Sequence, residues 1–137
     1  MQFRDLKAQY AALKEDIDTA ISQVIEDCNF ISGRQVRELE EQLEEYVGVK
    51  HCITCANGTD ALALALMALK IGPGDAVFVP DFTFFSSGEV VPFLGAQPVF
   101  VDVDASTFNI SCDSLEKMIV KTVEEGKLCP KVIIAVD

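Results

Sequence analysis

Basic residues are scarce in this 137-residue sequence, which also has a single histidine and no tryptophan. Eleven Lys and Arg residues stand against 22 Asp and Glu, giving a formal net charge of −11. Because nucleic-acid binding needs a basic face to neutralise phosphates, this composition argues against a nucleic-acid partner. No hydrophobic run is long enough to span a bilayer, and the first residues lack a signal-peptide core, so we also expect no membrane partner.

The five cysteines match no disulfide framework, and their number is odd. Reduced thiols in the cytoplasm fit this pattern best. Cys52 and Cys55 form a CxxC pair, but in a strand residues three apart point to opposite faces. No second pair accompanies them, and His51 is the one histidine. We therefore expect a cytoplasmic protein without a metal site.

The first third of the chain is predicted to form two amphipathic helices. Apolar residues recur every three or four positions over residues 6–28 and again over residues 36–47. Ser32-Gly33 is a turn signal between the two helices, and Gly48 ends the second. The acidic stretch ELEEQLEEY falls at helical spacing, so a solvated helix face accounts for it.

From residue 51 onward, short apolar runs alternate with helical segments. The runs are CITCA, AVFVP, PVFVDV and KVIIAV, and the helices are expected at residues 60–70, 86–94 and 113–125. The last three runs are apolar nearly throughout, which is typical of strands covered on both faces. This alternation predicts right-handed crossovers and a mostly parallel sheet, so the fold class is α/β. Residues 61–69 are apolar throughout, which predicts a helix buried on all sides.

The stretch Asn57-Gly58-Thr59-Asp60 joins the first apolar run to that helix. The first turn of a helix has unpaired N–H groups and a partial positive charge, and glycine lets a ligand approach closely. At the carboxyl edge of a sheet such a turn makes a phosphate cradle, to which Thr59 adds a hydroxyl. Taken alone, the four residues favour an ordinary helix start with Asn57 or Thr59 as N-cap.

Longer motifs change that balance. NGTDAL, IGPGD, VPDFTFF and LGAQPVFVDVD, in this order and spacing, resemble the DegT/DnrJ family of nucleotide-sugar aminotransferases. The resemblance implies a pyridoxal-phosphate enzyme of the aspartate-aminotransferase fold (fold type I). The chain would be its N-terminal part, a truncated, partial three-layer αβα large domain. Residues 1–34 would form an N-terminal helix and a segment bordering the substrate pocket, and residues 35–137 would begin the cofactor-binding domain.

The resemblance also assigns residues and partners. It implies that Gly58, Thr59 and Asp60 hold the cofactor phosphate and that Phe84 stacks on the pyridine ring, although plain core packing explains Phe84 equally well from the sequence. The implied substrates are a keto nucleotide-sugar (UDP- or dTDP-linked, with the keto group at C3) and glutamate as amino donor, in surface polysaccharide or amino-sugar biosynthesis. The family also implies a homodimer with the active site at its interface.

The family's chemistry needs a lysine that forms a Schiff base with the cofactor and an aspartate at the pyridine nitrogen. In the family both lie beyond the position that matches Asp137, so no residue here is assigned a catalytic role. Later strands would also separate CITCA from the other runs and cover apolar edges of AVFVP and KVIIAV. Two alternatives stay open: a binding module that keeps the phosphate cradle without chemistry, and a truncated reading frame without a function of its own.

The first prediction is that this chain alone has no transaminase activity, because no lysine stands in the family's Schiff-base context. After mixing with pyridoxal phosphate, borohydride reduction and digestion, peptide mapping should find no single specifically labelled lysine. Stoichiometric labelling of one lysine, with a visible absorption band before reduction, would contradict this. All the candidate lysines are expected on helix or turn surfaces: Lys7, Lys14, Lys50, Lys70, Lys117, Lys121, Lys127 and Lys131.

Overall fold

The computed structural model describes residues 3–136. The chain divides into two compact units, one ending at Thr54 and the other beginning at Cys55. In the first unit, α1 (Leu6–Asp27) and α2 (Arg34–Val47) are the two predicted helices, and Gly48 ends α2 in the left-handed conformation as expected. This division at residue 54 follows how densely each part of the chain packs on itself. The boundary predicted at residue 34 separates parts with different functional roles, and it stays a prediction.

The run of residues 52–56 is not a strand, contrary to the sequence prediction. Side chains of α2 bind its backbone instead: the N–H of Cys52 donates to Glu44 Oε1 at 2.8 Å, and the N–H of Thr54 donates to Glu40 Oε1 at 2.9 Å. The Glu40 carboxylate accepts hydrogen bonds from the Thr54 backbone N–H, which has the larger effect, and from the Thr54 hydroxyl. These bonds hold the pKa of Glu40 below its ordinary value. A strand requires a partner ladder, and the ladders of the described residues pair the other three runs.

The second unit contains a three-stranded parallel sheet in the order β2-β1-β3. The strands are β1 (Asp75–Pro80), β2 (Gln97–Val101) and β3 (Cys129–Ile133). The predicted α/β class and parallel pairing are confirmed. The run AVFVP was expected to leave an edge unpaired, but it forms the central strand and is paired along both edges. β3 begins two residues before KVIIAV, and its register shifts between Ala76 and Val77 of β1.

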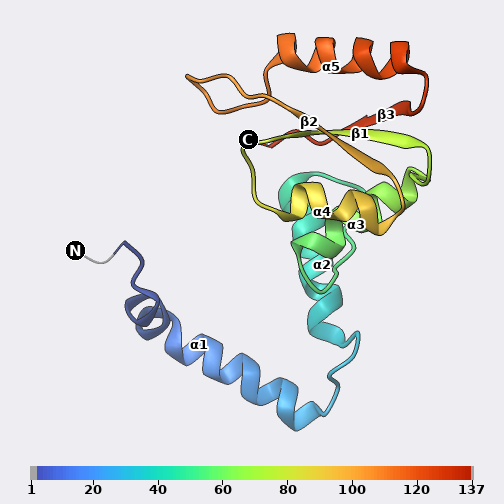
Figure 1. Ribbon diagram of the computed structural model, residues 1–137. Helices are drawn as coiled ribbons and strands as arrows, with labels where there is room; N and C mark the ends of the chain where they lie inside the picture. The colour runs from blue at the N-terminus through green and yellow to red at the C-terminus, as the bar shows by residue number, and fades with distance from the viewer. Residues whose placement is uncertain (1–2, 137) are drawn as a thin grey trace. The chain divides into compact units, whose positions relative to one another are not determined.

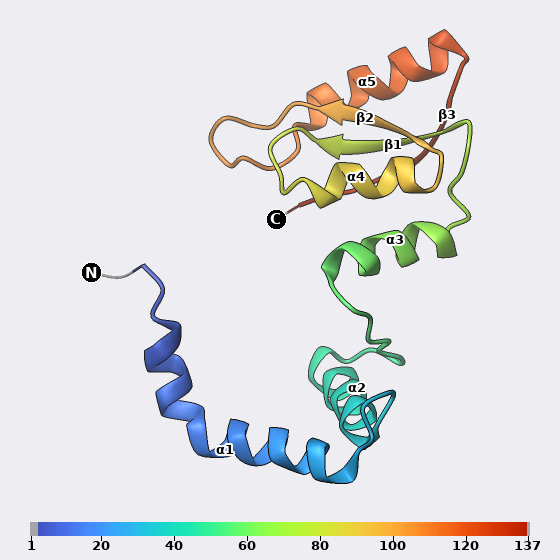
Figure 2. The ribbon, with the colours of Figure 1, turned by 60° about the horizontal axis from the view of Figure 1, so that its bottom comes forward.

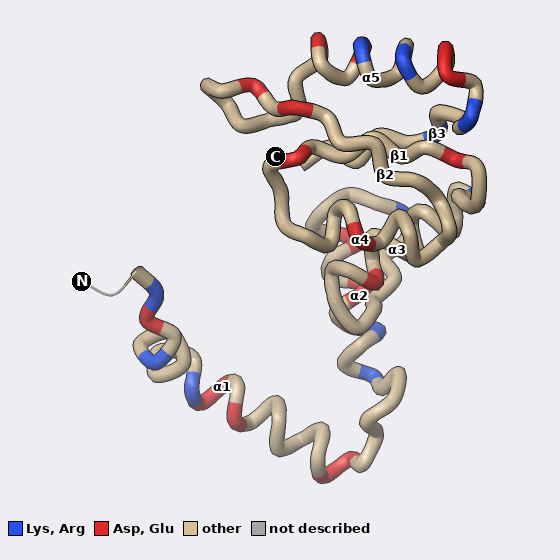
Figure 3. The backbone as a smooth tube through the Cα atoms, in the orientation of Figure 1, with Lys and Arg blue, Asp and Glu red and all other residues tan. Residues whose placement is uncertain are grey.

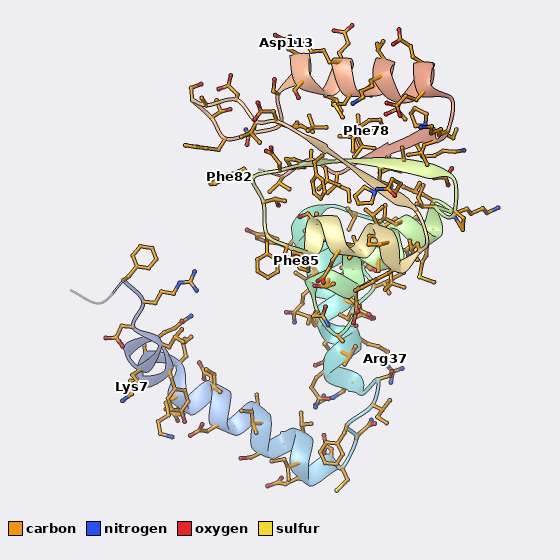
Figure 4. The ribbon with its side chains drawn as sticks, in the orientation of Figure 1. Lys7, Arg37, Phe78, Phe82, Phe85 and Asp113 are labelled. Atoms are coloured by element: carbon orange, nitrogen blue, oxygen red, sulfur yellow. The ribbon has the colours of Figure 1, made fainter. Side chains whose placement is uncertain are left out.

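Helices cover both faces of this sheet, as Figures 1 and 2 show. The face that carries Val77 and Val79 packs against α3 (Gly58–Ala68) and α4 (Ser86–Phe93). The opposite face carries Ala76 and Phe78 and packs against α5 (Cys112–Glu125). Figure 4 shows Phe78 between the sheet and α5. Alternate residues of β1 thus divide the core in two, which confirms the predicted three layers in this part of the fold.

Helix α3 is buried along one side only, which corrects the prediction of burial on all sides. Leu66 is 3% exposed, whereas Leu64, Met67 and Leu69 are 48%, 56% and 61% exposed. Among the described elements, α4 is the one that packs closely against α3. An apolar composition shows that a helix can be buried, but the number of its neighbours decides how much of it is buried.

Charged residues recur along α5, while the strands carry few of them (Figure 3). All the lysines named above are exposed, as predicted. The five cysteines are free thiols. Within residues 3–136, no helix combines the length and the apolar character needed to cross a bilayer.

The second prediction uses the asymmetry of α3. Leu66→Ala should lower the free energy of unfolding by about 2–5 kcal/mol, because it leaves a cavity in the core cluster that Leu66 shares with Val90 and Val77. Leu64→Ala removes the same atoms from the exposed side of the same helix and should change it by less than about 0.5 kcal/mol. Urea unfolding of both variants measures the difference. Equal losses would mean that α3 is covered on both sides.

Candidate functional site

Helix α3 begins with a turn whose N–H groups are open to a ligand. Asn57 is the N-cap: its side-chain oxygen accepts the N–H of Asp60 at 3.0 Å, and its amide donates to the Asp60 carboxylate at 3.1 Å. Within the described residues, the N–H groups of Gly58 and Thr59 donate to no protein acceptor. A β-carbon on Gly58 would meet nothing within 4 Å. The turn therefore offers two N–H donors and the Thr59 hydroxyl at the positive end of a helix, with room in front of Gly58.

Phe84 lies in the segment 81–85, which leaves the carboxyl end of β1 and leads into α4. Phe82, Phe84 and Phe85 are 62%, 78% and 75% exposed. The backbone between them is fixed, because Thr83 Oγ1 lies 2.9 Å from the buried hydroxyl of Ser87 and the N–H of Ser87 donates to the Phe84 carbonyl at 3.1 Å. Core packing within this chain therefore does not account for Phe84. Clustered exposed aromatic side chains on a fixed backbone are typical of a contact surface.

Two hollows border this segment. One has a volume of about 420 Å³ and lies between residues 81–84, the loop 107–109 and Val136. The other has a volume of about 330 Å³ and lies against α4 and β2, where prolines and phenylalanines line it. Phe84 is the one aromatic residue that borders both hollows. Their volumes fall in the range of small-molecule sites.

The loop of residues 104–109 forms the far wall of the larger hollow. The Asp104 carboxylate accepts the N–H groups of Ser106 at 2.8 Å and Thr107 at 3.1 Å, and the Ser106 hydroxyl. Two backbone bonds close the loop, from the Asp104 N–H to the Asn109 carbonyl and from the Phe108 N–H to the Asp104 carbonyl, both at 2.8 Å. The hydrogen bonds to its carboxylate hold the pKa of Asp104 below its ordinary value. The bond from the Ser106 hydroxyl has the largest effect, and the two N–H groups come next.

The predicted site residues lie at one edge of the second unit. Figures 1 and 2 show that the N-termini of α3 and α4 and the carboxyl ends of the strands are on the same side. Gly58, Thr59 and Asp60 open α3, and Phe84 comes two residues before α4. No hydrogen bond between described residues joins the two groups. In open α/β sheets this carboxyl edge is where ligands bind.

Two features of this edge were not predicted from the sequence. One is the hydrogen bond between Thr83 and Ser87, which no periodic pattern marks. The other is the loop 104–109, for which a signal exists: the stretch beginning Asp104-Ala105-Ser106 has the composition of an Asx turn. The loop also contacts the β1–α4 segment through the rings of Phe108 and Phe82, and this contact has no local signal because it joins residues far apart in the chain.

The model of the DegT/DnrJ/EryC1/StrS aminotransferase family matches residues 11–137. The chain belongs to this family. It is 48% identical over 119 residues to the UDP-2-acetamido-2-deoxy-3-oxo-D-glucuronate aminotransferase of Pseudomonas aeruginosa, a match that covers 87% of this chain and 33% of that protein. It is also 48% identical over 115 residues to the UDP-N-acetyl-3-dehydro-alpha-D-glucosamine 3-aminotransferase of Acidithiobacillus ferrooxidans (84% and 31%). The chain thus spans about a third of the length of these relatives.

Solved structures agree with this family. A DegT DnrJ EryC1 StrS aminotransferase from Brucella abortus is 52% identical and superposes with a TM-score of 0.96, over 100% of this chain and 37% of that one. NtdA from Bacillus subtilis, solved with bound pyridoxamine phosphate, is 29% identical with a TM-score of 0.76, over 88% and 26%. The fold is therefore that of the fold type I aminotransferases, and the family and its neighbours indicate pyridoxal phosphate as the cofactor.

The third prediction concerns the pH dependence of the loop 104–109. Because the folded pKa of Asp104 is lowered, its carboxylate stabilises the loop at pH values above the ordinary aspartate pKa of about 3.9, and this stabilisation disappears as the pH falls through the lower folded value. In an NMR titration the amide signals of Ser106 and Thr107 should move with a midpoint below the ordinary aspartate value of about 3.9. Asp104→Asn should abolish that step. A midpoint at or above the ordinary value would contradict the hydrogen-bond network.

Proposed function

We propose that this chain supplies part of the cofactor site of a pyridoxal-phosphate-dependent aminotransferase that acts on a keto nucleotide-sugar. One observation carries the proposal. In a chain of this family, a turn with two open N–H groups and a hydroxyl lies at the same edge of the sheet as the exposed ring of Phe84. A phosphorylated aromatic cofactor needs a receptor for its phosphate and one for its ring.

The residues present fit the two ends of pyridoxal phosphate. The N–H groups of Gly58 and Thr59 and the Thr59 hydroxyl would hold the phosphate, and the space in front of Gly58 would admit it. The Asp60 N–H already donates to Asn57, so Asp60 would act by holding the turn in shape. Phe84 would stack on the ring, an arrangement worth about 0.5–1.5 kcal/mol beyond the area buried. When bound, the cofactor supplies the electron sink and amino-group carrier for transamination.

The substrate proposal rests on the names of relatives. The two proteins reported above carry UDP-linked sugars in their names, with 3-oxo or 3-dehydro groups. We propose that the substrate of this protein is likewise a keto nucleotide-sugar, which is UDP- or dTDP-linked and has its keto group at C3. Glutamate would be the amino donor. Surface polysaccharide or amino-sugar biosynthesis in the cytoplasm would use the product, and the complete enzyme would act as a homodimer.

A second candidate is a non-catalytic chain that binds phosphate without transamination. It is favoured by the exposure of every lysine in the described structure, since none is buried beside Phe84 or the turn at Gly58. Sequencing the coding region beyond Asp137 separates the two candidates. An in-frame continuation with the family's aspartate and lysine supports the enzyme, and an immediate stop codon supports the non-catalytic chain.

The fourth prediction tests the phosphate turn with pyridoxamine phosphate, which cannot form Schiff bases with surface lysines. Thr59→Val should weaken its binding by about 1.5–3 kcal/mol, roughly 10- to 150-fold, because a hydrogen bond to a charged acceptor is lost. Gly58→Val should weaken the binding of pyridoxamine phosphate more, because the valine side chain enters the space where the phosphate approaches. Isothermal titration calorimetry measures both affinities, and thermal unfolding of the same samples measures stability.

The controls separate ligand binding from folding. Gly58 has no positive φ, and its added side chain meets no protein atom within 4 Å, so Gly58→Val should fold normally. Asn57 rather than Thr59 caps the helix, so Thr59→Val should leave the melting temperature nearly unchanged. Thr19→Val makes the same substitution within α1, away from any helix start, and should change neither quantity. Affinity that is unchanged in both Gly58→Val and Thr59→Val would reject the phosphate cradle.

A further inference from the structure

The backbone of Phe108 adopts a conformation that its residue type disfavours. Its φ is 63°, in the left-handed region that a bulky residue rarely occupies. The hydrogen bonds around Asp104 hold it there, including the Phe108 N–H to the Asp104 carbonyl at 2.8 Å. The isolated bridge between Val103 and Ile110 closes the base of the loop, and Ile110 packs onto the core beside Phe78. The loop therefore presents Phe108 from a fixed base.

The Phe108 ring contacts the segment that carries Phe84. Its centroid lies 5.3 Å from that of Phe82, with the ring planes inclined at 35°. This geometry is a favourable aromatic pair, although both rings remain more than half exposed. Figure 4 places Phe82 beyond the carboxyl end of β1, at the edge of the sheet where the proposed cofactor site lies.

Phe84 is thus held from both sides. On its N-terminal side, Phe82 is fixed by the ring of Phe108, and on its C-terminal side Thr83 and the Phe84 carbonyl are fixed by Ser87. The Phe84 side chain itself makes no polar contact and is 78% exposed. Its direction therefore depends on the backbone at residues 82–84. Of the two anchors, the Phe82–Phe108 pair is the one supplied from a separate part of the chain.

We propose that Phe108 is a positioning residue for the cofactor ring: by packing against Phe82 it fixes the β1–α4 segment so that Phe84 presents its face to the pyridine. The inference rests on the proposed function, because it assumes that Phe84 stacks on the ring. A role confined to filling the loop would make Phe108 important for stability and irrelevant to ring binding.

The test uses the 137-residue chain with two probes. Pyridoxamine phosphate engages both the turn and the ring receptor, whereas inorganic phosphate engages the turn alone. Phe108→Asn removes the ring while asparagine tolerates the left-handed backbone, so this variant should fold. Phe108→Tyr keeps the ring, Phe82→Leu removes the other half of the pair, and Phe84→Ala removes the proposed stacking ring. Thermal unfolding of each variant checks that it is folded.

Ring stacking is read from the upfield NMR shift of the pyridine protons of pyridoxamine phosphate, and affinity is read by titration. Phe108→Asn and Phe82→Leu should each reduce that shift. Each should also lower the affinity for pyridoxamine phosphate by about 2- to 12-fold, which is the range that an aromatic stack supplies. Both should leave inorganic phosphate affinity unchanged. Phe108→Tyr should retain wild-type values.

The remaining outcomes overturn the inference in distinguishable ways. If Phe84→Ala reduces the shift but Phe108→Asn and Phe82→Leu do not, Phe108 has no positioning role and the proposed function stands. If Phe108→Asn lowers the affinity for inorganic phosphate as much as the affinity for pyridoxamine phosphate, Phe108 contributes to general stability and not to ring binding. If Phe84→Ala leaves the shift and the affinity unchanged, the ring receptor in the proposed function is wrong and the inference falls with it.

Discussion

Burial of β1 on both faces and along both edges is the constraint on which the second unit depends. Its residues Ala76 to Pro80 are all buried, and alternate side chains build the two halves of the core. The ladder continues past the end of the strand, where the N–H of Asp81 donates to the Val101 carbonyl at 3.0 Å. The segment that carries Phe84 therefore leaves the sheet from a fixed point. A loop that starts from a rigid strand can hold an exposed side chain in a defined place.

The phosphate cradle proposed for this acidic chain would have to rely on local donors. The net charge of −11 repels anions at long range, but at physiological ionic strength charges more than about 8 Å apart are largely screened. Figure 3 shows charged residues recurring along helices such as α5. The turn itself contains one acid, Asp60, whose carboxylate accepts a hydrogen bond from Asn57. The open N–H groups of Gly58 and Thr59 act at contact distance, where they dominate.

The parts of this fold that depend on local pattern were predictable, and the parts that depend on neighbours were not. Helical periodicity and apolar runs located α1 to α5 and the three strands to within a few residues. The same logic failed for residues 52–56, because a strand exists only beside a partner and the carboxylates of Glu40 and Glu44 bind that backbone instead. It also overestimated the burial of α3. The exposure of Phe84 could not be predicted, because neither composition nor spacing encodes which aromatic residues of 82–85 lie outside the core.

In the loop 104–109, hydrogen bonds maintain an unfavourable backbone conformation at Phe108. A non-glycine residue in the left-handed region costs on the order of 1–3 kcal/mol, and the bonds made by Asp104 offset that cost within the same loop. An asparagine or glycine at position 108 would remove the strain, but it would also remove the ring that meets Phe82. Fixing the segment before a ligand arrives means that binding need not order it, which favours affinity for a flat ring. The positioning role proposed for Phe108 would therefore account for the strain at this residue.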